Sequence, residues 1–133
     1  MTEAPQWVDE HGRVLYDVFA KDCTSRPTLE HVTGRWGTLA MVALRDGAVR
    51  FNALRRRIDG VSEKMLAQTL QSLERDGLVH REAQATIPPR VDYSLTPLGR
   101  KTADKLHDLI ELVESQMPEV EAARLRYDEA KRA

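Results

Sequence analysis

Apolar residues recur every three or four positions along most of the chain, and Gly, Pro and Asp residues separate these runs. Such spacing predicts short amphipathic helices. The first is expected over residues 8–20, with an apolar side formed by Val8, Val14, Leu15, Val18 and Phe19. A second helix is expected to begin near Pro27, to bend near Gly34 and to continue to Gly47, with its apolar side in the core.

The stretch between Val49 and Gly77 predicts a helix, a turn and a second helix. The first helix has an apolar side formed by Phe51, Leu54 and Ile58, and Asp59-Gly60 ends it. Ser62 is suited to cap the second helix through its hydroxyl, and Gly77 is placed to end it. The buried stripe of this second helix is expected to consist of Leu66, Leu70 and Leu73.

The other side of this second helix is polar. Its residues follow helical spacing and are Lys64, Gln68, Gln71 and Arg75. Gln can pair with adenine in the major groove of DNA, and Lys or Arg can reach guanine or a phosphate. A solvated helix face has the same composition, so the stripe alone leaves both interpretations open.

Residues 78–81 and 91–95 have the pattern of two strands joined by a Pro88-Pro89-Arg90 tip. Proline stiffens such a tip, and Arg90 could enter a minor groove or meet a phosphate. A hairpin in this place, directly after two helices and a turn, is typical of a winged helix-turn-helix protein.

Thr96 and Pro97 are suited to cap and open a long C-terminal helix, which Pro118 ends. Its apolar stripe is Leu98, Leu106, Leu109, Ile110, Val113 and Met117. This stripe is longer than a small core can cover, and burial of apolar surface stabilises by ~25 cal/mol per Å². We therefore expect its excess to pack on a second copy of the chain. The charged tail after Pro118 can be helical or loose.

The net charge of −1 hides an uneven distribution. From Arg35 to Lys101 there are 12 Arg and Lys against 7 Asp and Glu, whereas the two flanks together hold 8 against 14. Attraction to phosphates acts over short distances, so the basic segment from Arg35 to Lys101 can bind nucleic acid although the net charge of the chain is negative. Ordinary unevenness of surface charge is the plainer alternative.

Composition and motifs exclude several classes of protein. With 41% hydrophobic and 31% charged residues, no long apolar run and no secretion signal, the chain is expected to be soluble and cytoplasmic. A single cysteine, Cys23, fits a reducing compartment. The four histidines lack the spacing of metal sites, and no phosphate loop, nucleophile elbow or pair of catalytic carboxylates occurs. We expect no cofactor, no structural zinc and no enzymatic activity.

Several segments resemble the HxlR-type family of bacterial winged-helix regulators. They are Cys23 with Trp36 thirteen positions later, Arg50-Phe51-Asn52-Ala53-Leu54, Val61-Ser62-Glu63-Lys64-Met65-Leu66, Leu73-Glu74-Arg75-Asp76-Gly77-Leu78-Val79, Pro88-Pro89-Arg90-Val91-Asp92-Tyr93-Ser94-Leu95-Thr96, and Gly99. The resemblance implies a mainly α fold with a small β-hairpin wing (α+β), and a homodimer joined by N- and C-terminal helices.

One winged helix-turn-helix domain is expected over 1–133. Its predicted parts are an N-terminal dimerisation helix at 8–22, a DNA-binding core and wing at 23–96, a C-terminal dimerisation helix at 97–117 and a tail at 118–133.

The function that the resemblance implies is sequence-specific binding of double-stranded DNA by a transcriptional regulator, with repression as the expected outcome. We assign contacts with base edges to Lys64, Gln68 and Gln71. Phosphate or groove positioning is assigned to Ser62, Arg50, Arg55, Arg75 and Arg90. The two-fold symmetry of a homodimer predicts an inverted-repeat operator with half-sites about 34 Å apart.

Cys23 is the candidate sensor, because the resemblance links its position to regulators that respond to electrophiles or oxidants. Lys21 and Arg26, and the helix start expected just after Cys23, favour the thiolate, whereas Asp22 opposes it. A small packed residue is an equal alternative for Cys23.

Two other functions of the protein also stay open. One is a regulator that binds a small molecule between the core and the C-terminal helices without thiol sensing, and the other is a module that binds another protein.

Overall fold

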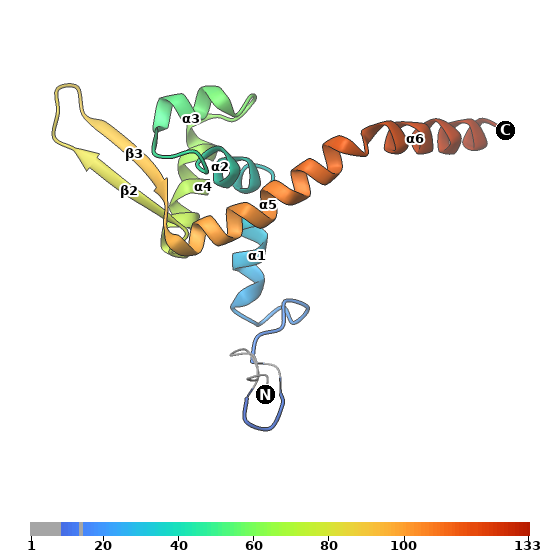
Figure 1. Cartoon of the computed structure of the whole chain (residues 1–133), viewed down its shortest axis with the longest axis horizontal. Coiled ribbons are helices and arrows are strands. Elements are labelled where there is room, and N and C mark those ends of the chain that lie inside the picture. Colours follow the sequence, from blue (N-terminus) through green and yellow to red (C-terminus); the bar gives the residue numbers. More distant parts are fainter. Residues whose placement is uncertain (1–8, 14) are drawn as a thin grey trace.

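The computed structural model describes residues 9–13 and 15–133 (Figure 1). Its helices and strands are, in chain order, α1 (Ser25–Thr33), α2 (Gly37–Ala43), β1 (Val49–Arg50), α3 (Phe51–Arg57), α4 (Glu63–Arg75), β2 (Val79–Gln84), β3 (Arg90–Leu95), α5 (Pro97–Ser115) and α6 (Met117–Arg132). The strands form one antiparallel sheet in the order β1-β3-β2. The predicted mainly α fold with a small wing is therefore confirmed.

The core lies where α2, α3, α4, α5 and the sheet meet, and α4 is specified as the pattern predicts. Leu66, Leu70 and Leu73 are fully buried along one side of α4. At its start the N–H of Met65 donates to the Ser62 hydroxyl at 3.1 Å. At its end Gly77 takes a φ of +77°, a conformation that favours glycine after a helix. Both predicted ends of α4 are thus confirmed.

The wing consists of β2 and β3 (Figure 1). The two strands pair from Val79 opposite Leu95 to Gln84 opposite Arg90. They are longer than the predicted strands at 78–81 and 91–95, so Arg90 lies within β3 and not in the tip. The sheet also contains β1, whose Val49 pairs with Tyr93. A strand of two residues is too short to show an alternating pattern.

The helix predicted from Pro27 to Gly47 is two helices, because the expected bend near Gly34 is a complete break. Gly34 has an extended conformation with a ψ of 164°. A Cβ added at Gly37 would lie 1.9 Å from the carbonyl oxygen of His31, so a glycine is required where α2 starts against α1.

The helix predicted over residues 8–22 is wrong for the described part of that segment, which contains turns. The Asp9 carboxylate accepts the backbone N–H groups of His11 and Arg13, and Asp17 accepts that of Phe19. Such bonds compete with helical ones. Gly12, at a φ of +77°, adds a bend. The expected apolar side is not buried in this chain, since Phe19 is 90% exposed. Val8 and Val14 lie outside the described residues.

The predicted C-terminal helix ends at Ser115, and the tail forms a further helix, α6. Thr96 caps α5 as expected, since its hydroxyl accepts the N–H of Gly99 at 3.0 Å. In Figure 1, α6 continues away from the core beyond the end of α5. The exposed apolar side chains of these two helices include Leu98, Leu109, Leu112, Val113, Val120, Leu125 and Tyr127. Within the described part of the chain, every helix is too short or too polar to cross a membrane.

Candidate nucleic-acid interface

The polar side of α4 is open to solvent. Its four side chains, Lys64, Gln68, Gln71 and Arg75, all belong to exposed residues, whereas the leucines on the other side are fully buried. The structure therefore brings these four predicted site residues together on one accessible face. Ser62 is also exposed, but its hydroxyl is used as the cap of α4.

A basic groove lies between α3 and the wing. We call it the wing groove; its volume is about 670 Å³, and it is lined by Arg50, Phe51, Asn52, Ala53, Arg56, Arg81, Gln84, Thr86, Ile87, Pro88, Pro89, Arg90, Val91 and Tyr93. Four of these residues are arginines, and they come from β1, α3, β2 and β3. The lining contains no acidic residue. Of the predicted site residues, Arg50 and Arg90 lie here.

Arg90 is held more tightly than the sequence suggested. Its Nε–H donates to both carboxylate oxygens of Asp92, at 3.0 and 3.2 Å. The side chain keeps 40% of its surface exposed. Asp92 also accepts a hydrogen bond from the Gln84 amide at 3.3 Å. The wing thus fixes Arg90 beside its own counter-charge.

The three consecutive arginines of α3 have different surroundings. Arg55 is exposed and does not line the wing groove, although it was the predicted contact. Arg56 lines the wing groove. Arg57 lines a separate groove between α2, α3 and α5, together with the acidic residues Asp46, Asp59 and Glu114.

Sequence reasoning missed Arg56, Arg81 and one contact that positions α4. Nδ1 of His31 on α1 lies 2.6 Å from a carboxylate oxygen of Asp76, the residue that follows α4. The two residues are 45 positions apart, so no local spacing indicates the contact. From the sequence, Arg56 can be described only as part of the basic run Arg55-Arg56-Arg57, and Arg81 only as part of a predicted strand.

Cys23 lies between the N-terminal turns and α1. Its Sγ is 3.1 Å from the Ser25 hydroxyl and accepts the backbone N–H of Asp17 at 3.2 Å. Hydrogen bonds from Ser25, and then from the Asp17 N–H, hold the pKa of the Cys23 thiol below its usual range. The sequence predicted a thiolate favoured by Lys21, Arg26 and the helix start that follows. The direction agrees, but hydrogen bonds are the cause.

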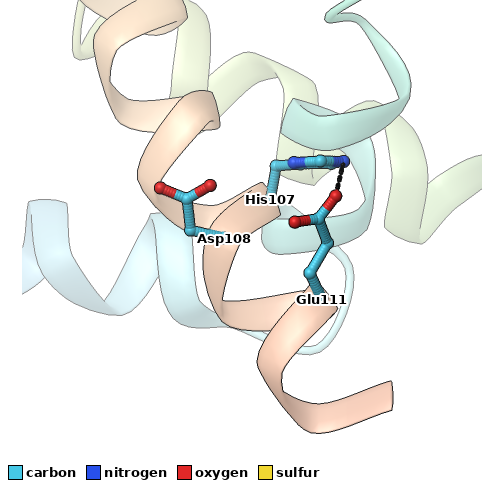
Figure 2. A group of neighbouring side chains, drawn as sticks. All are labelled: His107, Asp108 and Glu111. Carbon is cyan, nitrogen blue, oxygen red and sulfur yellow. Dashed lines mark ion pairs between the residues drawn. The ribbon is translucent and has the colours of Figure 1, made fainter. Parts of the chain in front are cut away.

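A group of potential metal ligands occurs on α5. Oxygen and nitrogen atoms of His107, Asp108 and Glu111 lie within 4.8 Å of one another. Figure 2 shows that His107 and Glu111 turn toward each other, whereas Asp108 points away from that pair. The His107 Nε2 and a Glu111 carboxylate oxygen are 3.4 Å apart, one helical turn along α5. Such a pair is common on solvated helices, and the absence of a metal site stays a prediction.

Comparison with known proteins identifies the family. The family model for HxlR-like helix-turn-helix proteins matches residues 31–121. The chain belongs to this family. It is a transcriptional regulator with a helix-turn-helix domain, and the proteins of this family are DNA-binding regulators and not enzymes. The predicted family and the predicted lack of enzymatic activity are thereby confirmed.

Individual relatives agree with this assignment. The chain is 55% identical to the uncharacterized HTH-type transcriptional regulator YtfH of Escherichia coli over 108 residues, which cover 81% of this chain and 86% of that one. The solved structure of YtfH from Salmonella typhimurium has a TM-score of 0.79 and 53% identity, covering 82% of this chain and 97% of that one. The redox regulator HypR in its reduced form has a TM-score of 0.67 and 36% identity, covering 74% and 97% respectively.

Proposed function

We propose that this regulator is a homodimer that represses transcription by binding an inverted-repeat operator, with α4 in the major groove and the wing beside it. Lys64, Gln68 and Gln71 contact base edges in this proposal. Arg50, Arg55, Ser62, Arg75 and Arg90 position the protein on the backbone. The regulator acts in the cytoplasm as one winged helix-turn-helix domain with dimerisation elements toward both ends.

The observation that carries the proposal is the division of α4 into two sides. Its leucines are fully buried, and its glutamines and basic residues are exposed. A helix whose polar side is free and basic can enter a major groove without rearranging the core. The apolar side chains left exposed on α5 and α6 support a dimer, because their burial against a second copy would remove them from water.

A second part of the proposal concerns control. We propose that Cys23 senses electrophiles or oxidants. Its lowered pKa increases the thiolate fraction at neutral pH, and the thiolate is the reactive form. A redox regulator, HypR, is among the structurally similar proteins. If diamide leaves the DNA affinity of the wild type unchanged, Cys23 has no such role.

The test of DNA reading uses Gln68→Ala on an operator obtained by selecting bound sequences from random duplex DNA. The selected sequence should be an inverted repeat. Gln68→Ala should lose ~1–3 kcal/mol of discrimination at one base pair, because one bidentate contact with a base edge is removed. The affinities of wild type and variant for matched and single-mismatch duplexes measure this loss.

The control for this test is Gln116→Ala, which removes the same side-chain type at the junction of α5 and α6. It should keep the discrimination of the wild type. A wild-type protein without preference for any duplex sequence would overturn the proposed function.

A further inference from the structure

The wing groove has an electrostatic character that the contacts of α4 do not explain. Among the described residues, Arg50, Arg56 and Arg81 form no ion pair, whereas Arg90 is paired with Asp92. Of the two wing carboxylates, Asp92 is already paired, and neither Asp92 nor Glu82 lines the groove. Asp92 binds Arg90 and Gln84, and Glu82 lies 3.9 Å from His80. The three arginines therefore face the groove without a counter-charge from the protein.

A comparison with Arg57 shows that the lack of counter-charges is specific to the wing groove. Arg57 follows Arg56 directly, but its groove also contains the acidic residues Asp46, Asp59 and Glu114. Uncompensated guanidinium groups gathered around one groove repel each other, and an anion relieves this repulsion. The charge pattern therefore marks the wing groove, and not the Arg57 groove, as the place for an anionic partner.

The shape of the groove indicates which anion. Its arginines stand on four separate elements along the space between α3 and the wing, and two of its walls belong to the helix-turn-helix unit and the wing. The residues between the wing strands bring no charge to it, and the exposed Ile87 extends from their turn. An open, basic channel between α3 and the wing suits an extended polyanion better than a small one.

We propose that Arg50, Arg56 and Arg81 bind backbone phosphates of the duplex in the wing groove, beside the bases that α4 contacts. This inference rests on the proposed function, since it needs a DNA-bound α4. The contact carries no sequence information. It adds affinity that is equal for all sequences and sensitive to salt, and it adds Arg56 and Arg81 to the residues that position the protein on the DNA backbone.

The test is a salt titration of duplex binding by the wild type, Arg56→Ala/Arg81→Ala and Arg57→Ala. Each phosphate contact contributes about 0.9 to the slope of log affinity against log salt. The double variant should lose about 2 units of slope per bound protomer. A bound homodimer should thus lose about 4 units in total, so that between about 50 and about 200 mM salt the wild type should weaken on the order of a hundredfold more than the double variant. Selected and scrambled duplexes should be affected by the same factor.

Arg57→Ala is the matched control, because it removes the same charge from the next residue of α3 and should keep the wild-type slope. A double variant with the slope of Arg57→Ala would overturn the inference while leaving sequence-specific binding, and hence the proposed function, intact. A thermal shift with inorganic phosphate that the double variant abolishes, together with an unchanged slope, would also overturn it and assign the groove to a small anion. A wild type that binds no duplex would contradict the proposed function itself.

Discussion

At the scale of single residues, the environment of Cys23 determines its chemistry. The thiol has two hydrogen-bonding neighbours, Ser25 and the backbone of Asp17. Both favour the thiolate, whereas partial burial and the negative charge of Asp17 oppose it. The balance lowers the pKa of the thiol, and Ser25 contributes most to this lowering.

We therefore expect Ser25→Ala to raise the pKa of Cys23, because the variant removes the largest stabilising contact of the thiolate. The rate of alkylation by iodoacetamide rises with pH through the pKa of the thiol, since only the thiolate reacts. Its pH profile should shift to higher pH in the variant, with slower alkylation at pH about 7. Thr24→Ala is the control, since the Thr24 side chain does not cap α1. Equal profiles for Ser25→Ala and wild type would disprove the role of Ser25.

The amino-acid sequence predicted the α4 side of the candidate interface but not all the arginines of the wing groove. The exposed stripe on α4 followed from periodicity, because burial on a helix repeats with its turn. The sequence Arg55-Arg56-Arg57 gave no means of separating its members. They differ only through partners from other elements, such as the wing for Arg56 and α5 for Arg57. The pairing of Arg90 with Asp92 likewise depends on the position of both in β3.

At the scale of elements, local signals predicted α4 and α5 well, because capping side chains and apolar stripes act within one helix. Their caps, Ser62 and Thr96, form the expected bonds. The segment at 8–22 has an apolar stripe but no residue that caps a helix. The carboxylates of Asp9 and Asp17 accept hydrogen bonds from nearby backbone N–H groups instead. Strand β1 forms because it pairs with β3, and no local sequence pattern predicts this pairing.

The joint between the wing and α5 depends on Gly99. A Cβ at this position would lie 1.9 Å from the carbonyl oxygen of Leu78, which also accepts the N–H of Thr96 at 3.1 Å. The Thr96 hydroxyl donates to the carbonyl of Gly77 at 2.6 Å. These contacts fix the start of α5 against the end of α4, so the backbone has little room to move.

Gly99→Ala should therefore destabilise the fold by about 1–3 kcal/mol or more, the usual cost of forcing extra atoms into a packed site. Urea unfolding followed by circular dichroism measures this as a lower midpoint. Lys101→Ala, at an exposed position of the same helix, should change stability by no more than about 0.5 kcal/mol. A Gly99→Ala protein as stable as Lys101→Ala would show that α5 can shift away from the wing without cost.

At the scale of the whole molecule, the wing and the end of α6 lie at opposite ends (Figure 1). The proposed DNA contacts of the wing therefore lie at one end, and the helices with exposed apolar side chains extend toward the other. On the second half of α5, Leu109, Leu112 and Val113 are 51%, 59% and 49% exposed. They lie on one side of α5, at spacings of one, three and four residues. A homodimer formed there would leave both copies of α4 and both wings free.

Leu112→Asp tests this arrangement, because a charge placed in an apolar interface must be desolvated. The side chain is exposed within one chain, so the variant should fold normally but dissociate into monomers of 15.1 kDa. The wild type should sediment with about twice that mass. Affinity for the inverted repeat should fall strongly in the variant, because a monomer binds a single half-site and loses the gain from simultaneous binding of two. Arg100→Ala, which removes an exposed side chain from the first half of α5, should remain a dimer. A wild type that sediments as a monomer while still binding its selected operator tightly would exclude α5 as the dimer contact and would require each chain to read DNA alone.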